Sequence, residues 1–269
     1  MAVLPPGTLL QLMYLRERIA GLPPGRFVEV GPGSGEITCL LLEHGWSGQS
    51  FDLDAGTISN LSQRCASEIK RKRFVAINSD FLATPAPAAT ERVDIIISCM
   101  VMEHMDEDAE TAFMQASKGW LNEKGLMLGL VPASPAHWGI EDEIAGHYRR
   151  YTAASIQALI QENGWHLRHI AGLTFPTSNL LLPISNYLVN KSERGKLRLS
   201  ALERTKQSGR REVMFKTQFP ALLQTVLNRH TLYPLHLLQK ACAKSERALV
   251  LYFEASPDST AVVDSKDGN

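Results

Sequence analysis

Three glycines at alternate positions, Gly31, Gly33 and Gly35, follow a short apolar segment at residues 26–30 and precede a helical stretch at 36–44. A strand, a glycine turn and a helix in this order let the backbone approach a ligand closely and point the helix N-terminus at it. The spacing is G-x-G-x-G, not G-x-G-x-x-G, and no Lys-Ser/Thr pair follows the loop. The segment therefore predicts a nucleotide-type site that matches neither the dinucleotide fingerprint nor a phosphate-binding loop.

Acidic residues follow the next two predicted strands. Asp52 ends the strand 49–52, where a carboxylate can accept hydrogen bonds from both hydroxyls of a ribose. Asp80 follows the strand 74–77, where an acid can bond an adenine amino group, and Phe81 adds a ring that could stack on the base. Either acid could instead cap a strand end. Ligands of open α/β sheets bind along the carboxyl edge of the strands, so features at three successive strand ends favour a ligand site.

The elements that must position these residues alternate between strand and helix. The strands are continuously apolar, which is typical of a parallel sheet covered by helices on both faces. The predicted elements are helix 7–20, strand 26–30, helix 36–44, strand 49–52, helix 55–70, strand 74–77, strand 93–98, helix 107–121, strand 126–131, helix 153–163, strand 165–170, a mostly helical segment 174–247 and a final strand 248–253.

Four segments together resemble the motifs of class I S-adenosylmethionine-dependent methyltransferases. They are VEVGPGSGE (28–36), FDLD (51–54), SDF (79–81) and VDIIISCMVMEHM (93–105), and the last is similar to the fourth-strand motif of ubiquinone-pathway O-methyltransferases. The resemblance covers about residues 27–170. It implies an α/β fold with a doubly wound, mostly parallel seven-stranded sheet and a helical insertion before the last strand. It also implies S-adenosyl-L-methionine as the cofactor.

The same resemblance assigns roles to individual positions. Asp54 is a rival to Asp52 for the ribose, but Asp54 falls where a serine usually begins the next helix, so Asp52 is preferred. The implied cofactor contacts are Gly31, Gly33 and Gly35 around the methionine part, Glu29 beneath that loop, Asp52 at the ribose, Asp80 and Phe81 at the adenine, and Cys99 after the fourth strand.

Two absences after the fourth strand narrow the chemistry. Ser98-Cys99-Met100 stands where amino-group methyltransferases of adenine or glutamine carry N/D-P-P-Y. No Pro-Cys dipeptide is present there, which argues against cysteine-driven methylation of cytosine C5. Cys99 is therefore interpreted as a small apolar residue against the cofactor, not as a nucleophile.

The segment 138–152 contains D-E-x-x-G-H-x-R-R-Y-T, which resembles an element of a broad subgroup of these methyltransferases. It follows the fifth strand and so belongs on the cofactor side of the sheet. Methyl transfer requires the acceptor atom to be placed in line and a proton to be removed. Because histidine titrates near neutral pH, His147 is the leading candidate for a general base and His104 is the alternative. His147 could instead hold the loop by bonding Asp142 or a backbone carbonyl.

The neighbours of His147 are predicted to bind the acceptor. Arg149 and Arg150 can grip an anionic group bidentately, or they can pair internally with the acids at 141–143. The predicted acceptor residues are Tyr148, Arg149, Arg150 and Tyr151.

The formal net charge of zero conceals a basic segment. Residues 174–247 carry 13 basic and 4 acidic residues, a net charge of +9, and are predicted to form a lid beside the acceptor pocket. Their charge could attract an anionic acceptor, a carrier protein or an acidic membrane surface, or simply be solvated. The predicted organisation is an N-terminal helix (1–22), a cofactor-binding core (23–173), the basic lid (174–247), the final core strand (248–255) and a disordered tail (256–269).

Composition excludes several broad classes. Over 269 residues, 28 basic and 28 acidic side chains balance, which argues against a generally basic nucleic-acid binder. The four cysteines form no CxxC pair, and no cluster has zinc-ligand spacing, so the expectation is reduced thiols and no metal. We find no signal peptide and no run of about 18 apolar residues, so a cytoplasmic protein is expected.

The leading hypothesis is therefore a methyltransferase for a small or lipid-like acceptor, with O-methylation in a biosynthetic pathway ahead of N-methylation. An RNA methyltransferase that uses the basic arm is one alternative, although no aromatic residues interleave with the basic ones. A non-catalytic binding module with a methyltransferase fold is the other. The sequence leaves the oligomeric state open.

Overall fold

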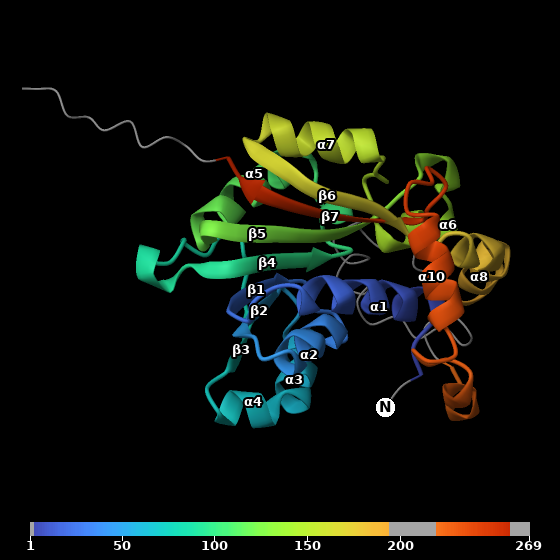
Figure 1. Ribbon diagram of the computed structural model, residues 1–269, viewed down its shortest axis with the longest axis horizontal. Helices are drawn as coiled ribbons and strands as arrows, with labels where there is room; N and C mark the ends of the chain where they lie inside the picture. The colour runs from blue at the N-terminus through green and yellow to red at the C-terminus, as the bar shows by residue number, and fades with distance from the viewer. Residues whose placement is uncertain (1–2, 194–218, 259–269) are drawn as a thin grey trace, which may run out of the picture.

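Seven strands form one sheet in the order β3-β2-β1-β4-β5-β7-β6 in the computed structural model, which describes residues 3–193 and 219–258 (Figure 1). The first five strands run parallel, and β7 is antiparallel to both of its neighbours, β5 and β6. The expected mostly parallel seven-stranded sheet is confirmed. The strands are β1 (Arg26–Val30), β2 (Ser47–Asp52), β3 (Phe74–Asn78), β4 (Val93–Cys99), β5 (Leu121–Pro132), β6 (Trp165–Leu173) and β7 (Val250–Pro257).

Helices cover both faces of the sheet because its central strands are apolar on both sides. In β4, Ile95, Ile96 and Ile97 are all at most 1% exposed. One face packs under α5 (Glu107–Trp120) and α7 (Ala153–Glu162), the other under α1 (Pro6–Ala20), α2 (Glu36–Glu43) and α3 (Ala55–Arg64) (Figure 1). The remaining helices are α4 (Ala66–Lys70), α6 (Ile140–Ala145), α8 (Thr177–Glu193) and α10 (Tyr233–Ala241), with short turns η1 (Ala89–Glu91), η2 (Met102–His104), η3 (Pro135–His137) and η5 (Ala221–Thr225).

Strand register brings the functional loops to one edge. Val30 at the end of β1 lies opposite Ser98 of β4, and Cys99 at the end of β4 lies opposite Leu130 of β5. The loop from Gly31, the turn η2 and the helix α6 therefore all leave the sheet at its carboxyl edge.

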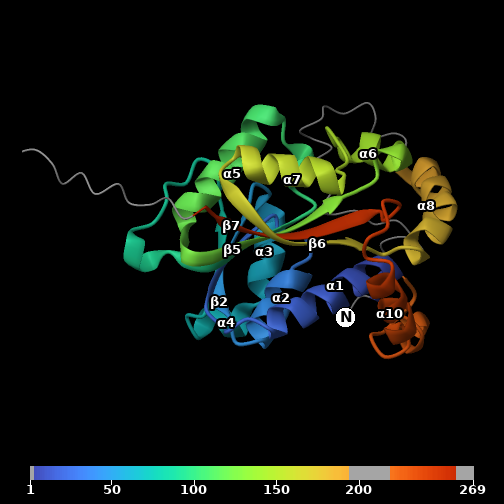
Figure 2. The same cartoon turned by 45° about the horizontal axis from the view of Figure 1, so that its top comes forward.

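Where the structure describes the segment between β6 and β7, it contains the helices α8, η5 and α10, joined by turns and irregular stretches. Its helix α8 lies beside α6, where the Ser185 hydroxyl donates to Glu141 Oε1 at 2.5 Å (Figure 2). Its helix α10 lies against α1, because Lys240 Nζ donates to Glu17 Oε2 at 2.6 Å and Gln239 Nε2 donates to the Leu10 carbonyl at 2.8 Å. The insertion is thus fixed both to the acceptor-side loop and to the N-terminal helix.

Some predicted boundaries differ from the structure. The expected helix 55–70 is divided into α3 and α4 at Cys65. The expected tail begins too early, because β7 continues through Pro257, paired with Trp165 of β6. Eight of the 13 basic residues in the predicted lid lie at 194–218, outside the described residues. Among the helices at 3–193 and 219–258, none is long and apolar enough to cross a membrane.

Candidate functional site

The glycine loop leaves room for a ligand at one position and packs tightly at two. Gly31, Gly33 and Gly35 all have positive φ angles, of 70°, 50° and 80°, a region that other residues occupy only with strain. A Cβ on Gly31 would lie 2.4 Å from Val101 Cγ2, and one on Gly35 would lie 2.5 Å from Leu61 Cδ1. A Cβ on Gly33 would meet nothing within 4 Å. The loop is therefore closed from behind and open at Gly33.

Glu29 lies buried beneath this loop with 2% of its surface exposed. Its Oε2 accepts hydrogen bonds from the Thr38 hydroxyl and, at 3.1 Å, from the Ser50 hydroxyl. Burial raises the pKa of Glu29 from 4.5 to about 7, against the lowering effect of those two hydroxyls. The position expected from the sequence is thus occupied by a carboxyl group that readily holds a proton.

Glu29 should make the folded chain less stable as the pH rises. Because its folded pKa is raised, the folded state keeps a proton that the unfolded chain releases, so stability is lost between about pH 4.5 and 7. We expect urea unfolding to show that wild type loses about 2 kcal/mol relative to Glu29→Gln between about pH 5 and pH 8. Parallel pH profiles for the two proteins would show that Glu29 is already ionised in the fold.

Asp52 and Asp54 have different tasks. Asp54 begins α3: its Oδ2 accepts hydrogen bonds from the Thr57 amide at 2.7 Å and from the Thr57 hydroxyl at 2.8 Å. Asp52 ends β2, and its Oδ1 accepts from the Asp54 amide at 2.8 Å. Asp54 is thus engaged as a helix cap, which supports the preference for Asp52 as the ribose ligand. That assignment stays a prediction.

The ring of Phe81 does not face the ligand edge, which corrects the expected stacking on adenine. Phe81 is 3% exposed, and its ring lies 5.6 Å from that of Phe51 and 5.8 Å from that of Phe113, both edge-on. Its side chain is therefore part of the core. Asp80 is exposed, and its Oδ1 accepts from the Leu82 amide at 2.9 Å. A contact to adenine from this segment is left to Asp80 and to the backbone of Phe81.

Cys99 ends β4 and packs against the core on the α1–α3 face. Burial, with smaller contributions from Glu103 and Glu29, raises the pKa of its thiol. A thiolate nucleophile is thereby disfavoured, in agreement with the interpretation of Cys99 as a packing residue.

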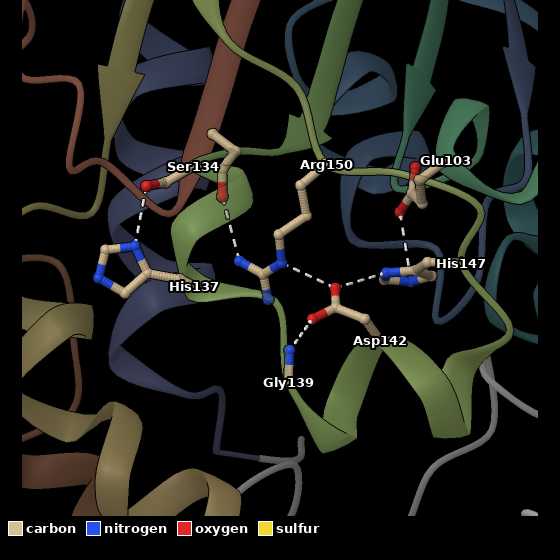
Figure 3. Close-up of polar contacts among 8 residues, drawn as sticks. Glu103, Ser134, His137, Gly139, Asp142, His147 and Arg150 are labelled. Atoms are coloured by element: carbon tan, nitrogen blue, oxygen red, sulfur yellow. Dashed lines mark hydrogen bonds and ion pairs between the residues drawn. The ribbon is translucent and has the colours of Figure 1, made fainter.

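His147 is held by Asp142 and lies beside His104. Its Nδ1 is 2.9 Å from Asp142 Oδ1 (Figure 3). Its ring centroid is 4.7 Å from that of His104. Burial would raise the pKa of Asp142, but hydrogen bonds from His147 and Arg150 outweigh it and lower that pKa. In the neutral imidazole that donates its Nδ1–H to Asp142, the Nε2 atom of His147 carries a lone pair. The expected bond to Asp142 and a chemical role for Nε2 are thus compatible.

Glu103 is the residue of this site that the sequence interpretation missed. It lies in η2, is 0% exposed, and its Oε1 is 3.8 Å from His147 Nε2 (Figure 3). Burial raises its pKa to about 8, although the backbone amide of Glu103 opposes that shift; Asp142 adds to it and Arg150 opposes it. The signal in the sequence was an acid between apolar residues, in Val-Met-Glu-His-Met, directly after the most apolar strand.

Three of the four predicted acceptor residues are internal, which corrects that part of the prediction. Arg150 donates from Nε to Asp142 at 2.8 Å, so the alternative of internal pairing holds for it. Arg149 donates from Nη1 to Glu110 of α5 at 2.8 Å, an acid outside the expected 141–143. Tyr151 is 3% exposed and its hydroxyl also donates to Glu110. Tyr148, 56% exposed, stays available to an acceptor.

Two solved structures share this fold at low identity. A magnesium protoporphyrin IX methyltransferase from Synechocystis PCC 6803, with bound S-adenosylhomocysteine, is 12% identical with a TM-score of 0.51, covering 62% of this chain and 77% of its own. The 1,6-didemethyltoxoflavin-N1-methyltransferase of Burkholderia thailandensis, with bound 1,6-didemethyltoxoflavin and S-adenosylhomocysteine, is 16% identical with a TM-score of 0.50, covering 63% and 73%.

A third likeness is local. A probable ribosomal RNA small subunit methyltransferase A from Methanospirillum hungatei is 42% identical over 64 residues, which are 23% of this chain and 25% of that protein. The match thus spans about a quarter of that relative.

The family model described as a methyltransferase domain matches residues 10–170. That range runs from α1 to β6 and includes the glycine loop, the strand-end acids and the His147 group. It covers more than half of the 269 residues, so the chain belongs to the methyltransferase domain family.

Proposed function

We propose that this chain is an S-adenosylmethionine-dependent methyltransferase that methylates a hydroxyl group of a small or lipid-like acceptor. The observation that carries the proposal is that an open glycine loop and a cluster of candidate proton acceptors lie at the same sheet edge. The loop follows β1, and the cluster consists of Glu103, His104 and His147 after β4 and β5.

The residues at the glycine loop fit the cofactor. Open space at Gly33 allows a ligand to approach the backbone, and closed packing behind Gly31 and Gly35 fixes the loop. These glycines with Glu29 would hold the methionine part, and Asp52 at the end of β2 would hold the ribose. Asp80 and the backbone of Phe81 would contact the adenine.

Oxygen is the acceptor atom that suits the polar groups of the site. When bound, S-adenosylmethionine supplies a methyl group on a cationic sulfur, and transfer forms an O–C bond while the S–C bond breaks and leaves its electron pair on sulfur. A hydroxyl must also lose its proton. We assign this role to Glu103 and His147, whose buried carboxyl group and imidazole lie 3.8 Å apart at the same sheet edge.

The acceptor side is bordered by α6 and α8, and α8 has an apolar exposed face. Leu180, Ile184 and Tyr187 are 76%, 60% and 65% exposed and follow helical spacing. This face, with the basic residues of 174–247, supports a lipid-like or anionic acceptor. Three further parts of the proposal rest on the sequence alone. The same segment would contact a carrier protein or a membrane, the reaction would belong to a biosynthetic pathway, and the protein would be cytoplasmic.

An RNA substrate is the second candidate, because the 64-residue likeness is to a probable ribosomal RNA methyltransferase. A non-catalytic binding module is the third. The small-molecule and RNA hypotheses differ in the molecule that receives the methyl group.

Methyl transfer with tritiated S-adenosylmethionine tests these readings together. We expect label in the organic extract of a cell lysate, little in total RNA, and much less label in the extract with Asp52→Ala at the same cofactor concentration. Label confined to RNA would replace the small acceptor by RNA. No label in either fraction, together with no binding of S-adenosylhomocysteine in calorimetry, would favour the non-catalytic module and overturn the proposal.

A further inference from the structure

Three side chains with metal-binding atoms meet at the carboxyl edge of β4 and β5. Glu103 and His104 come from η2, and His147 comes from the loop after α6. One ligand atom of each lies within 4.8 Å of the others. The Tyr148 amide donates to the Glu103 carbonyl at 2.7 Å, which fixes the two segments together.

Glu103 is the part of this group that requires a partner. It is fully buried, and among the described residues no other residue donates a hydrogen bond to either carboxylate oxygen. Its nearest ion-pair atom is His147 Nε2, at 3.8 Å, which is too long for a hydrogen bond. Buried polar groups in proteins are nearly always satisfied, because leaving one without a partner costs several kcal/mol at the upper end. A cation between Glu103 and the imidazoles would satisfy it.

His147 already has the support that a metal-binding histidine needs. Histidine ligands usually donate their second ring N–H to a carboxylate, which fixes the ring and its tautomer. Asp142 Oδ1 is hydrogen-bonded to His147 Nδ1 at 2.9 Å (Figure 3). Arg150 Nε donates a hydrogen bond to the same oxygen at 2.8 Å and so fixes the Asp142 side chain. Asp142 and Arg150 are thus positioning residues, and Nε2 of His147 faces Glu103.

We propose that Glu103, His104 and His147 bind one divalent transition-metal ion of the zinc class. Two imidazoles and one carboxylate suit such an ion and leave coordination positions open. Ligand atoms on one zinc ion lie roughly 3.4 Å apart for bonds of ~2.0–2.1 Å, so small side-chain rotations would close the present group around it. The sequence interpretation expected no metal, because Glu103-His104 and His147 are far apart in the chain.

A use of this ion in the reaction rests on the proposed function. A bound zinc-class ion would lower the pKa of an acceptor hydroxyl that it contacts, and solvent would take the proton, so the three ligands would not have to act as the base. The metal site and the proposed function together point to an acceptor with a metal-binding hydroxyl.

Calorimetry with zinc on the full chain, after removal of metals by a chelator, tests the site directly. Cobalt is the second probe, because bound Co²⁺ has a visible absorption that reports nitrogen and oxygen ligands. We expect one ion per chain, and at least about tenfold weaker binding in Glu103→Gln, His104→Gln and His147→Gln, since each loses one of three ligands.

His137→Gln is the matched control. His137 lies in η3 near the same loop, but its Nδ1 is bonded to Ser134 Oγ at 2.8 Å and it is not in the group (Figure 3). It should bind zinc as wild type does. Binding of S-adenosylhomocysteine shows that each variant is folded, and any one folded ligand variant is sufficient for the test.

The outcomes separate this inference from the proposed function. No zinc or cobalt binding by wild type, or equal binding by all variants, would overturn the metal site. Transfer that persists in the chelated protein would leave the proposed function standing without the metal. Stoichiometric metal binding without any transfer would leave the site standing and count against the function.

Discussion

Replacing Asp52 by alanine is expected to weaken the binding of S-adenosylhomocysteine by about 10- to 100-fold. Hydrogen bonds to a charged group contribute ~1.5–3 kcal/mol, and each 1.4 kcal/mol is about tenfold in affinity. Asp52 ends β2 at the ligand edge, and its carboxylate would accept hydrogen bonds from the ribose hydroxyls. Calorimetry on the purified chain measures the change.

Asp54→Ala is the matched control, because the same carboxylate is removed two residues away. It caps α3 through Thr57, so its loss should lower the free energy of unfolding by about 1 kcal/mol and leave the affinity nearly unchanged. Asp52→Ala is therefore expected to lose cofactor affinity but little stability, and Asp54→Ala is expected to lose stability but little affinity. An equal loss of affinity in both would refute the choice of Asp52 as the ribose ligand.

The largest stability effect is expected for Asp142→Ala, with a loss of about 3–5 kcal/mol in the free energy of unfolding. Asp142 is fully buried and bonds His147, Arg150 and the Gly139 amide. Its removal leaves the Arg150 guanidinium, whose side chain is 8% exposed, without a carboxylate. Urea unfolding measures the loss.

A second substitution shows how much of this loss comes from the unpaired Arg150 charge and how much from the packing lost with the Asp142 side chain. Arg150→Met in the Asp142→Ala background removes the stranded cation, so the double variant should be more stable than Asp142→Ala alone. If the double variant is the less stable of the two, the Asp142–Arg150 pair is not the cause of the loss.

The alternation of strands and helices was sufficient to predict the sheet. Continuous apolar runs such as that of β4 are buried on both faces, which only a covered parallel sheet provides. Boundaries were less predictable: the helix 55–70 breaks at Cys65, a local hydrogen-bonding detail with no Gly or Pro to mark it.

The site was predictable where spacing along one strand or loop decided the role. Asp54 begins a helix, as its position indicated, and the backbone at Gly33 is open to a ligand. Asp52 at the ribose stays a prediction. Roles that depend on a distant partner were not predictable. Glu110 lies some 40 residues before Arg149 and Tyr151, yet it engages both, so two residues that look like acceptor ligands are internal.

The position of β7 between β5 and β6 has a consequence for synthesis of the chain on the ribosome. In the sheet, β6 has β7 as its neighbour, but residues 174–249 must be made before that partner emerges. At ~5–20 residues per second, the nascent β6 waits roughly 4 to 15 seconds with unpaired backbone groups. Such an edge can pair with other chains. Emergence of β7 therefore completes two strand pairings at once, and a ribosome stalled within 174–249 presents an open sheet to chaperones.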